Sequence, residues 1–471
     1  MRETIFAVAP IVALIVMLTV FKAPAWKAAL AAFTVGALEA MLFCGVAPAA
    51  VAKCMGAGTQ TGLYPIGLVI VAALFTYAVT VESGAVGEIK RGLSSLSSDS
   101  RFFVLLTVWG FGNFMEGMAG FGTAVAIPCA LLVGVGFDPF KAVLCCLIAN
   151  TTPTAFGSVG VPTMALAKET GLELAQLSTF IALLQLAVTA LSPFLLLLIV
   201  DGWRGIRERW GLALAADIAF LVPWLVVAAM VGCELPNIVG GLSVMATLAL
   251  LGDFRKVDAR AQAWAWMPFG FVVVALGANA ALPAAWKVSP GILIVAAGFA
   301  GGLCQRIRPG RLALLLGATV RKYGLALLTI CLVLALAKVM DAAGMTGALA
   351  KTLVAATGRG YAAVASVVGA LAGFVTGSGT SSNILFGKLQ VSVATTPFSQ
   401  YLFAAANVMG AGIGKMVCPQ SMVLGCAAAG LAGRESDVMR KAFVFFVAVL
   451  AAACVATLAA ALLFGGTPQT L

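Results

Sequence analysis

Long apolar stretches recur along the whole chain and are separated by short polar connectors. Outside the two repeated segments compared below, they lie near 5–21, 28–46, 62–81, 102–115, 176–200, 211–231, 236–251, 265–281, 290–305, 323–340, 361–375 and 441–464. A helix needs about 20 apolar residues to cross the hydrocarbon core of a bilayer. The pattern predicts an all-α polytopic membrane protein with about 12–14 transmembrane helices. We expect the first stretch to be a retained span rather than a removed signal peptide.

One pattern of helix-interrupting residues occurs twice, in residues 116–162 and again in residues 373–419, without a gap. The matching pairs are Gly120 and Gly377, Gly122 and Gly379, Thr123 and Thr380, Asn150 and Asn407, Gly157 and Gly414, and Pro162 and Pro419. Upstream, Gly84 and Gly87 match Gly344 and Gly347. Helix breakers at corresponding positions of two halves are typical of a transporter's binding site. We therefore expect an internal repeat, inverted with respect to the membrane.

Each copy is expected to contain a re-entrant hairpin and a broken helix. Residues 117–136 are rich in glycine and suit a hairpin better than a straight span. Pro153 lacks a backbone donor and disfavours helix just before it, so 139–149 and 155–167 are predicted half-helices joined by unwound backbone. By analogy, Asn407 is expected to mark a second unwinding point. Such backbone is tolerated at membrane depth only where protein or a water-filled cavity satisfies it.

The charge of the connectors predicts the topology. Basic residues gather in 201–210, 253–260 and 306–322, whereas 232–237 and 282–289 carry almost no charge. The three basic connectors are therefore expected in the cytoplasm. We divide the chain into N-terminal helices (1–81), a first repeat (82–200), central scaffold helices (201–322), a second repeat (323–440) and a C-terminal helix (441–471).

The composition agrees with a membrane protein and excludes several functions. The chain is 62% hydrophobic and 10% charged, whereas soluble domains contain about 25% charged residues. The net charge of +11 comes from dispersed basic residues, so no nucleic-acid partner is expected. There is no histidine, and the eleven cysteines show no metal-binding spacing, so we expect neither a metal nor another cofactor. An enzyme is disfavoured for the same reasons, and broken helices at mid-membrane suit alternating access better than a channel.

Glu116, at the start of the first copy, is the leading candidate for proton coupling. A carboxylate at membrane depth costs roughly 2.5–3.5 kcal/mol when ionised, which favours a group that binds and releases a proton. The alternative is a helix-end glutamate satisfied by backbone donors of the hairpin. Glu39 is the second candidate and Asp217 a distant third, and each is more readily explained by contacts with a neighbouring helix.

The glycine-rich tips GFGT and GSGTSSN are candidates for substrate binding. Glycine allows backbone N–H groups to approach a ligand, and helix N-termini favour an anion. Neutral side chains there suit a small carboxylate that carries a hydroxyl. The alternative role of the glycine-rich tips is close packing of helices by small residues. For Lys415, the alternative is a side chain that extends to the membrane interface. The candidate substrate-binding residues are Gly120, Gly122, Thr123, Asn150, Thr151, Thr152, Ser378, Gly379, Thr380, Ser381, Ser382, Asn383, Asn407, Lys415 and Gln420.

The stretches EGMAGFGTAVAIP, LIANTTPTAFGSVGVP, GFVTGSGTSSNILFGKLQ and GIGKMVCPQ resemble the L-lactate permease family, within a broad superfamily of ion transporters built on inverted repeats. The resemblance implies uptake of L-lactate and related 2-hydroxy monocarboxylates, such as D-lactate and glycolate, together with a proton. It also places Glu116 in the proton path. A sodium-coupled carboxylate symporter of the same superfamily is the alternative, with Na⁺ held by carbonyls at 150–153 and 407–410. We expect a multi-pass protein of the bacterial inner membrane.

Overall fold

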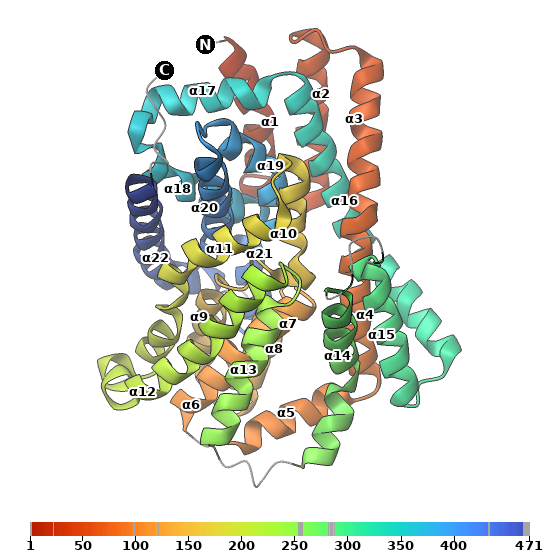
Figure 1. Cartoon of the computed structure of the whole chain (residues 1–471), viewed down its shortest axis with the longest axis vertical. Helices are drawn as coiled ribbons and strands as arrows, with labels where there is room; N and C mark the ends of the chain where they lie inside the picture. Colours follow the sequence, from red (N-terminus) through yellow and green to blue (C-terminus); the bar gives the residue numbers. More distant parts are fainter. Residues whose placement is uncertain are drawn as a thin grey trace.

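A computed structural model of the chain describes residues 2–21, 23–97, 99–120, 122–252, 258–280, 282, 286, 288–431 and 434–464 (Figure 1). All regular secondary structure in these residues is helical, and they contain no strand. The predicted all-α class is therefore confirmed. Arg255 and Lys256 of the expected basic connector 253–260, and Phe121 of the first glycine-rich tip, lie outside the described residues.

The helices follow in the order α1 (Arg2–Thr19), α2 (Ala25–Leu42), α3 (Pro48–Thr61), η1 (Gly62–Gly67), α4 (Leu68–Glu82), α5 (Ala85–Ser95), α6 (Ser100–Val104), η2 (Leu105–Gly112), α7 (Asn113–Met118), α8 (Thr123–Gly134), α9 (Pro139–Ala149), α10 (Gly157–Thr170), α11 (Leu174–Thr189), α12 (Ser192–Met230), α13 (Pro236–Leu251), α14 (Ala259–Ala280), α15 (Pro290–Cys304), α16 (Pro309–Ala342), α17 (Met345–Thr357), η5 (Gly358–Gly360), α18 (Tyr361–Thr376), α19 (Gly379–Ser392), α20 (Pro397–Lys415), α21 (Pro419–Ala428) and α22 (Glu435–Phe464). The η1 and η2 segments have the wide turns of a π-helix, and η5 is a 3₁₀ turn.

The helices differ widely in length. Within the described residues, five helical stretches are long and apolar enough to cross a membrane, or six if the bent pair α20 and α21 counts as one span. Several others, including α8 and α9, are shorter apolar helices of 10–17 residues. A helix as short as α9 rises only about 16 Å, roughly half of a bilayer core. Long spans thus alternate with half-length helices, and the number of crossings stays a prediction.

The helices pack in two groups. The first group consists of α1–α5 and α14–α17, in which α16 contacts α2, α3 and α4. The second consists of α6–α13 and α18–α22, and it contains both copies of the repeat. In Figure 1, α1, α2, α3, α16 and α17 occupy the top and right of the molecule, and α9, α12 and α13 lie below and to the left. Contacts of α16 and α17 with α19 join the groups.

Three segments expected to be connectors are helical. The basic segment 201–210 lies inside α12, with non-helical φ and ψ values at Asp201, Gly202 and Arg209. Residues 48–61 form α3, which continues through η1 into α4 with a kink at Tyr64. Glycine allows α3 to pack closely on α16, since a Cβ added at Gly58 would lie 2.5 Å from the backbone of Ala335. Residues 309–322, within the predicted connector 306–322, are the first turns of α16, because a proline at the first helical position starts the helix early. The predicted span 176–200 also has a break, between α11 and α12.

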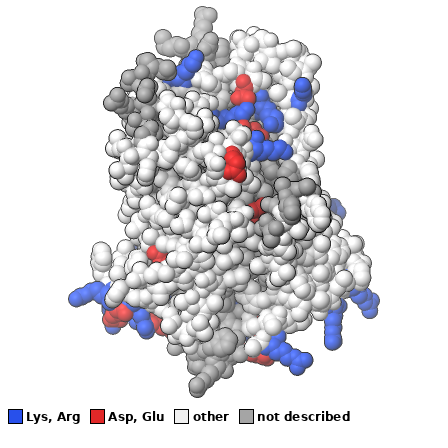
Figure 2. Space-filling view, viewed as in Figure 1, with Lys and Arg blue, Asp and Glu red and all other residues white. Residues whose placement is uncertain are grey.

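Charged side chains gather towards two levels of the molecule. Figure 2 shows basic groups at the lower end and others in the upper half, with a broad, mostly uncharged surface between them. At the lower end, Arg101 binds Glu208 at 2.6 Å and Asp201 at 3.4 Å. Arg311 binds Glu82 at 2.7 Å. These ion pairs link the start of α6 and the end of α4 to two of the predicted cytoplasmic connectors.

Candidate functional site

The first hairpin tip lies between α7 and α8. Gly120 and Gly122 adopt left-handed φ values of 62° and 85°, which side chains disfavour. A Cβ at Gly120 would also meet Ser158 Oγ at 2.0 Å. Helix α8 packs back along η2. The structure therefore has the predicted hairpin, but its first arm is the whole stretch α6–η2–α7, which starts well before residue 117.

The second hairpin tip lies between α18 and α19. Gly377 ends α18 with a left-handed φ of 63°. Ser378 then caps α19, because its Oγ accepts a hydrogen bond from the Ser381 N–H at 3.2 Å. Thr376 Oγ1 accepts from the Ser378 N–H at 3.2 Å and fixes the turn. Cap and turn leave the first N–H groups of α19, at Gly379 and Thr380, without a partner inside the helix.

The first broken helix is confirmed. Helix α9 ends at Ala149, residues 150–156 form turns, and α10 begins at Gly157. Protein donors satisfy much of the unwound backbone: the Asn150 carbonyl accepts from Thr154 Oγ1 at 2.8 Å, the Thr152 carbonyl from Gln185 Nε2 at 3.1 Å, and the Pro153 carbonyl from Asn237 Nδ2 at 2.7 Å. The buried break is therefore held by side chains of α11 and α13, as unwound backbone at membrane depth requires.

The first turn of α10 is left-handed. Ser158, Val159 and Gly160 have φ values of 45°, 57° and 78°. Such values are unfavourable for a β-branched residue like Val159 and persist only where the surroundings impose them. Here Ser158 Oγ donates to the Ala119 carbonyl of the first tip at 3.0 Å. The strained turn thus anchors the start of α10 to the hairpin.

The second unwinding point is not at Asn407, so that prediction is wrong. Helix α20 runs without interruption to Lys415, and the break falls before Pro419, where α20 and α21 meet at a bend of 44°. The reason is the position of proline: Pro153 follows Asn150 closely, whereas no proline follows Asn407 until Pro419. Both copies are therefore interrupted just before the matching Pro162 and Pro419, but the first break starts earlier, at Asn150.

The two copies exchange contacts reciprocally. Helix α10, which follows the first break, packs on α19 of the second hairpin, and α21, which follows the second break, packs on α8 of the first. Gly387 of α19 lies against Leu166 of α10, and Gly425 of α21 lies against Val143 and Val125. The matching glycines Gly84 and Gly344 also cap α5 and α17 with left-handed φ values. These contacts favour two related copies; their inversion with respect to the membrane stays a prediction.

Both tips and both breaks border one cavity of about 130 Å³. A water occupies about 30 Å³, so the cavity has room for a small organic ion. Four helices begin at its wall: α8, α10, α19 and α21. Helix dipoles and N–H groups without a partner inside the helix, such as those of Gly379 and Thr380, favour an anion. The lining residues are Glu116, Gly122, Thr154, Gly157, Ser158, Pro162, Ala326, Thr329, Ile330, Thr376, Gly377, Ser378, Gly379, Thr380, Ser381, Lys415, Gln420, Ser421 and Leu424.

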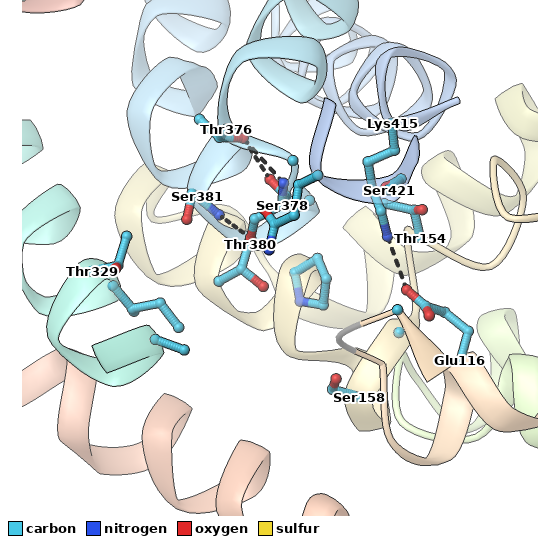
Figure 3. A pocket seen from close by; sticks show the side chains of 18 of the residues that line it. Glu116, Thr154, Ser158, Thr329, Thr376, Ser378, Thr380, Ser381, Lys415 and Ser421 are labelled. Carbon is cyan, nitrogen blue, oxygen red and sulfur yellow. Dashed lines mark hydrogen bonds and ion pairs between the residues drawn. The ribbon is translucent and has the colours of Figure 1, made fainter. Parts of the chain in front are cut away.

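A buried ion pair lies in the wall of this cavity. Lys415 Nζ donates to Glu116 Oε1 at 3.0 Å, and the side chains are 9% and 4% exposed. Figure 3 shows the lysine entering from α20 and the glutamate from α7, with Thr154 and Ser421 beside them. The second carboxylate oxygen of Glu116 has no hydrogen-bond partner among the described residues. The pair is neutral as a whole, but it retains one unsatisfied acceptor.

The cavity brings together about half of the residues expected to bind substrate. The predicted residues that line it are Glu116, Gly122, Ser378, Gly379, Thr380, Ser381, Lys415 and Gln420. Others stabilise the surrounding backbone instead: Thr123 Oγ1 donates to the Gly120 carbonyl at 2.9 Å, and Thr151 Oγ1 to the Ile148 carbonyl at 2.8 Å. Gly120, Asn150, Thr152 and Ser382 also lie outside the lining. Glu39 lies on α2, in the other group of helices, and is not part of this wall.

Asn383 and Asn407 lie behind the cavity and bind each other. Asn407 Nδ2 donates to Asn383 Oδ1 at 3.0 Å, and Asn383 Nδ2 donates to the Pro162 carbonyl at 3.0 Å. Gln390 extends this chain to Tyr361, whose hydroxyl donates to Gln390 Oε1 at 2.7 Å. The network joins α10, α19, α20 and α18 in the bundle interior. We expected these asparagines to contact substrate; the structure gives them a supporting place.

Several lining residues were not predicted. Thr154, Ser158 and Thr376 lie within the repeated segments, but their hydroxyls gave no separate signal in the sequence. Ser421 directly follows Gln420. Thr329, on α16, is different, because it comes from outside both copies and lies across the cavity from the tips (Figure 3). Only the folded arrangement of the two helix groups could reveal it.

Comparison with known proteins identifies the family. The model of a family described as L-lactate permease matches residues 3–276 and 267–464. The chain belongs to the L-lactate permease family. An L-lactate permease of Streptococcus iniae is 38% identical over 375 residues, which cover 72% of this chain and 79% of that protein. An L-lactate permease of Escherichia coli K12 is 32% identical, with 80% and 81% covered.

One relative with a similar sequence identity is named for a different substrate. A glycolate permease of Escherichia coli K12 is 33% identical over 473 residues, which cover 82% of both chains. Lactate and glycolate permeases thus lie at similar distances from this member of the L-lactate permease family. Membership makes it a transport protein of the membrane, in agreement with its long apolar helices.

Proposed function

We propose that this protein is a proton-coupled symporter of L-lactate and related 2-hydroxy monocarboxylates, including D-lactate and glycolate, in the bacterial inner membrane. The observation that carries the proposal is the cavity at which four helix N-termini meet the buried Glu116–Lys415 pair. Helix N-termini and a cation together suit a carboxylate. The relatives named for lactate and glycolate support this substrate class.

In this mechanism, the substrate carboxylate binds Lys415 and the free N–H groups of Gly379 and Thr380. The 2-hydroxyl group then has neutral partners within the same wall, among them Ser381 and Gln420. Serine hydroxyls and glutamine amides can both donate and accept hydrogen bonds, so a hydroxyl can be recognised without a second charge. A substrate without this hydroxyl would leave such groups unpaired and bind more weakly.

Competition for Lys415 couples the proton to the substrate. In the empty site, Glu116 neutralises Lys415. If lactate entered while Glu116 remained ionised, two carboxylates would share one cation, and their repulsion at about 5 Å would cost roughly 3 kcal/mol at an effective dielectric of about 20. Protonation of Glu116 removes that repulsion and releases Lys415 for the substrate. Lactate and a proton therefore bind together, and the site is neutral both empty and loaded.

This charge balance determines the driving force. Lactate and one proton carry no net charge, so the membrane potential contributes little to either the loaded or the empty crossing. The pH gradient contributes about 1.4 kcal/mol per unit. A sodium ion, or a second proton, would add about 2.3 kcal/mol per 100 mV. An imposed potential therefore separates the two forms of coupling.

Two observations weigh against sodium coupling. The carbonyls of Asn150, Thr152 and Pro153, which we considered as Na⁺ ligands, already accept hydrogen bonds from protein side chains. Residues 407–410 lie inside α20, where carbonyls accept from the helix itself. Neither site presents the set of free oxygen ligands that a hard cation prefers.

The first test is uptake of radiolabelled L-lactate into proteoliposomes with an imposed proton gradient and no sodium. Wild type is expected to accumulate lactate as the gradient increases, with no response to a potassium diffusion potential. Glu116→Gln should still exchange internal for external lactate, because Lys415 is free. Its gradient-driven uptake should be at least tenfold lower than that of wild type. Glu88→Gln, at an ion pair between neighbouring turns of α5, is the matched control. Uptake that ignores pH, or requires sodium, would overturn the proposal.

A further inference from the structure

Buried polar atoms without protein partners recur along η2 and α7, between the lower end of the molecule and the cavity. Among the described residues, Thr107 Oγ1, Trp109 Nε1, Asn113 Oδ1 and Glu116 Oε2 have no hydrogen-bond partner. All four residues are at most 3% exposed. Burial of one unpaired polar group costs about 1–3 kcal/mol, so a row of them along η2 and α7 requires an explanation.

Asp217 of α12 adds a carboxyl group to this row. It is 4% exposed, and its Oδ1 has no partner within the described part of the chain. One turn further along α12, Phe220 packs on Trp109 with ring centroids 4.8 Å apart. Residues one turn apart share a helix face, so Asp217 lies on the side of α12 that packs on η2.

The position of Asp217 along the path follows from an ion pair at its lower end. Arg209 of α12 binds Asp99, which caps α6, at 2.6 Å. Thr107 follows Asp99, and Asp217 follows Arg209, by the same number of residues. This spacing corresponds to a rise of about 12 Å, so Asp217 lies at about the level of Thr107. Glu116 lies beyond Thr107 in the continuous stretch formed by η2 and α7. Asp217 is thus about halfway between the cavity and the charged lower end.

Among the described residues, no ion pair involves Asp217. Of the elements that pack on α12, η2, α11 and α13 contain no ionisable side chain. Helix α9 contributes Lys141, Cys145 and Cys146, and Lys141 Nζ donates to the Val200 carbonyl at 2.7 Å. Arg101 of α6 is held by acidic groups at the lower end. An isolated buried carboxylate is costly, so Asp217 suits a group that is protonated at rest and ionised only briefly.

We propose that Asp217 relays the proton between Glu116 and the lower, basic end of the molecule. Waters beside Asn113, Trp109 and Thr107 complete the path, since buried polar atoms without protein partners are commonly satisfied by ordered water. Only O–H bonds break and form: Glu116 gives a proton to the water file, Asp217 passes one on, and one leaves at the level of Asp99. The wide turns of η2 support this role, because π-helical turns occur frequently at functional sites. The relay rests on the proton symport proposed above.

The experiment compares L-lactate exchange with gradient-driven uptake in the same proteoliposomes. Exchange needs no net release of the proton, so the exchange rate of Asp217→Asn should stay within about twofold of wild type. Its net uptake should be at least tenfold lower. Asp217→Glu should restore net uptake, because it can carry a proton. Asp138→Asn is the control, since Asp138 is exposed and caps α9, and asparagine caps equally well.

A second variant guards against misfolding of Asp217→Asn. Trp109→Phe keeps the packing on Phe220 but removes the unpaired indole N–H, and it should slow net uptake severalfold while leaving exchange unchanged. The relay would be overturned if Asp217→Asn kept the net uptake of wild type. It would also be overturned if a folded Asp217→Asn lost exchange while transport in Trp109→Phe was unaltered. If the wild-type protein itself ignores the pH gradient, the symport proposal fails instead, so the two failures are distinguishable.

Discussion

At the scale of single residues, Lys415 is the group whose loss should weaken substrate binding most directly. Lys415→Met removes the cation while keeping most of the buried side-chain volume. A hydrogen bond to a charged group contributes about 1.5–3 kcal/mol, so the half-saturation concentration for L-lactate should rise roughly tenfold to a hundredfold. Uptake measured against substrate concentration at a fixed pH gradient tests this. Lys351→Met, at an exposed position of α17, should behave as wild type.

The double variant separates binding from folding. Lys415→Met leaves the Glu116 carboxylate buried without its partner, which is costly. Adding Glu116→Gln removes that unpaired charge and should restore the amount of folded protein while substrate binding stays weak. Equal half-saturation concentrations in wild type and Lys415→Met would show that the carboxylate binds elsewhere in the cavity.

The sequence indicated both members of this ion pair, but not their contact. Glu116 stood out as an acid inside an apolar segment, and Lys415 as one of few cations in the second copy. They are 299 positions apart, and no local pattern measures such a distance. Asn383 and Asn407 show the converse: buried polar residues in a repeated motif predicted substrate contacts, but they bind each other. A pattern indicates that a polar residue has a partner, without indicating which one.

At the scale of helices, glycine determines how closely α18 and α20 approach. A Cβ at Gly410 would meet the Ser366 carbonyl oxygen at 2.1 Å. Gly410→Ala should therefore force the helices apart and lower the unfolding temperature, since overpacking costs about 1–3 kcal/mol. Thermal unfolding in detergent, followed by intrinsic fluorescence, measures the effect. Gly347→Ala on α17 is the control: no neighbouring atom of the described residues lies within 4 Å of its added Cβ, and alanine should stabilise the helix by about 0.5–1 kcal/mol. The packing argument fails if both changes shift the temperature equally.

Proline and glycine explain which breaks could be predicted. Pro153 located the first break, because a missing donor acts on the residues just before it. The second break was placed at Asn407 by analogy alone, and the helix continues to Lys415 because Pro419 is the next interruption. Gly414, which was matched as a helix-interrupting residue, serves close packing in the structure, as does Gly410. Composition cannot distinguish these two uses of glycine.

At the scale of the whole molecule, the two helix groups meet at the cavity. Thr329 of α16 comes from the first group and the hairpin tips come from the second. The sequence predicted the membrane class and the repeated core, because hydropathy and helix breakers are local. It did not predict that α16 begins near Pro309 or that α3 joins α4, since these depend on packing between distant segments.

The charged lower end predicts how stability depends on pH. Arg101 binds Asp99, Asp201 and Glu208, and Arg209 binds Asp99. Burial opposes ionisation of Asp99, but hydrogen bonds from Arg101 and the charges of Arg101 and Arg209 outweigh it, so the pKa of Asp99 lies below its ordinary value. A lowered folded-state pKa stabilises the protein above the unfolded value of about 3.9, and this contribution is lost as pH falls through the folded pKa.

Arg101→Gln should therefore lower the unfolding temperature at neutral pH, by about 1 °C in a chain of this length if the network contributes about 1 kcal/mol. In this variant the unfolding temperature should also fall less steeply below pH 4. The pKa of Asp99 then moves back towards its unfolded value, so fewer protons are taken up on unfolding. Thermal unfolding of wild type and variant from pH 7 to pH 3 measures both effects. Arg434→Gln, which breaks an exposed pair with Asp437, should leave the slope unchanged. Parallel curves for wild type and Arg101→Gln would mean that the lower end is held by apolar packing of α6 on α12 rather than by its charges.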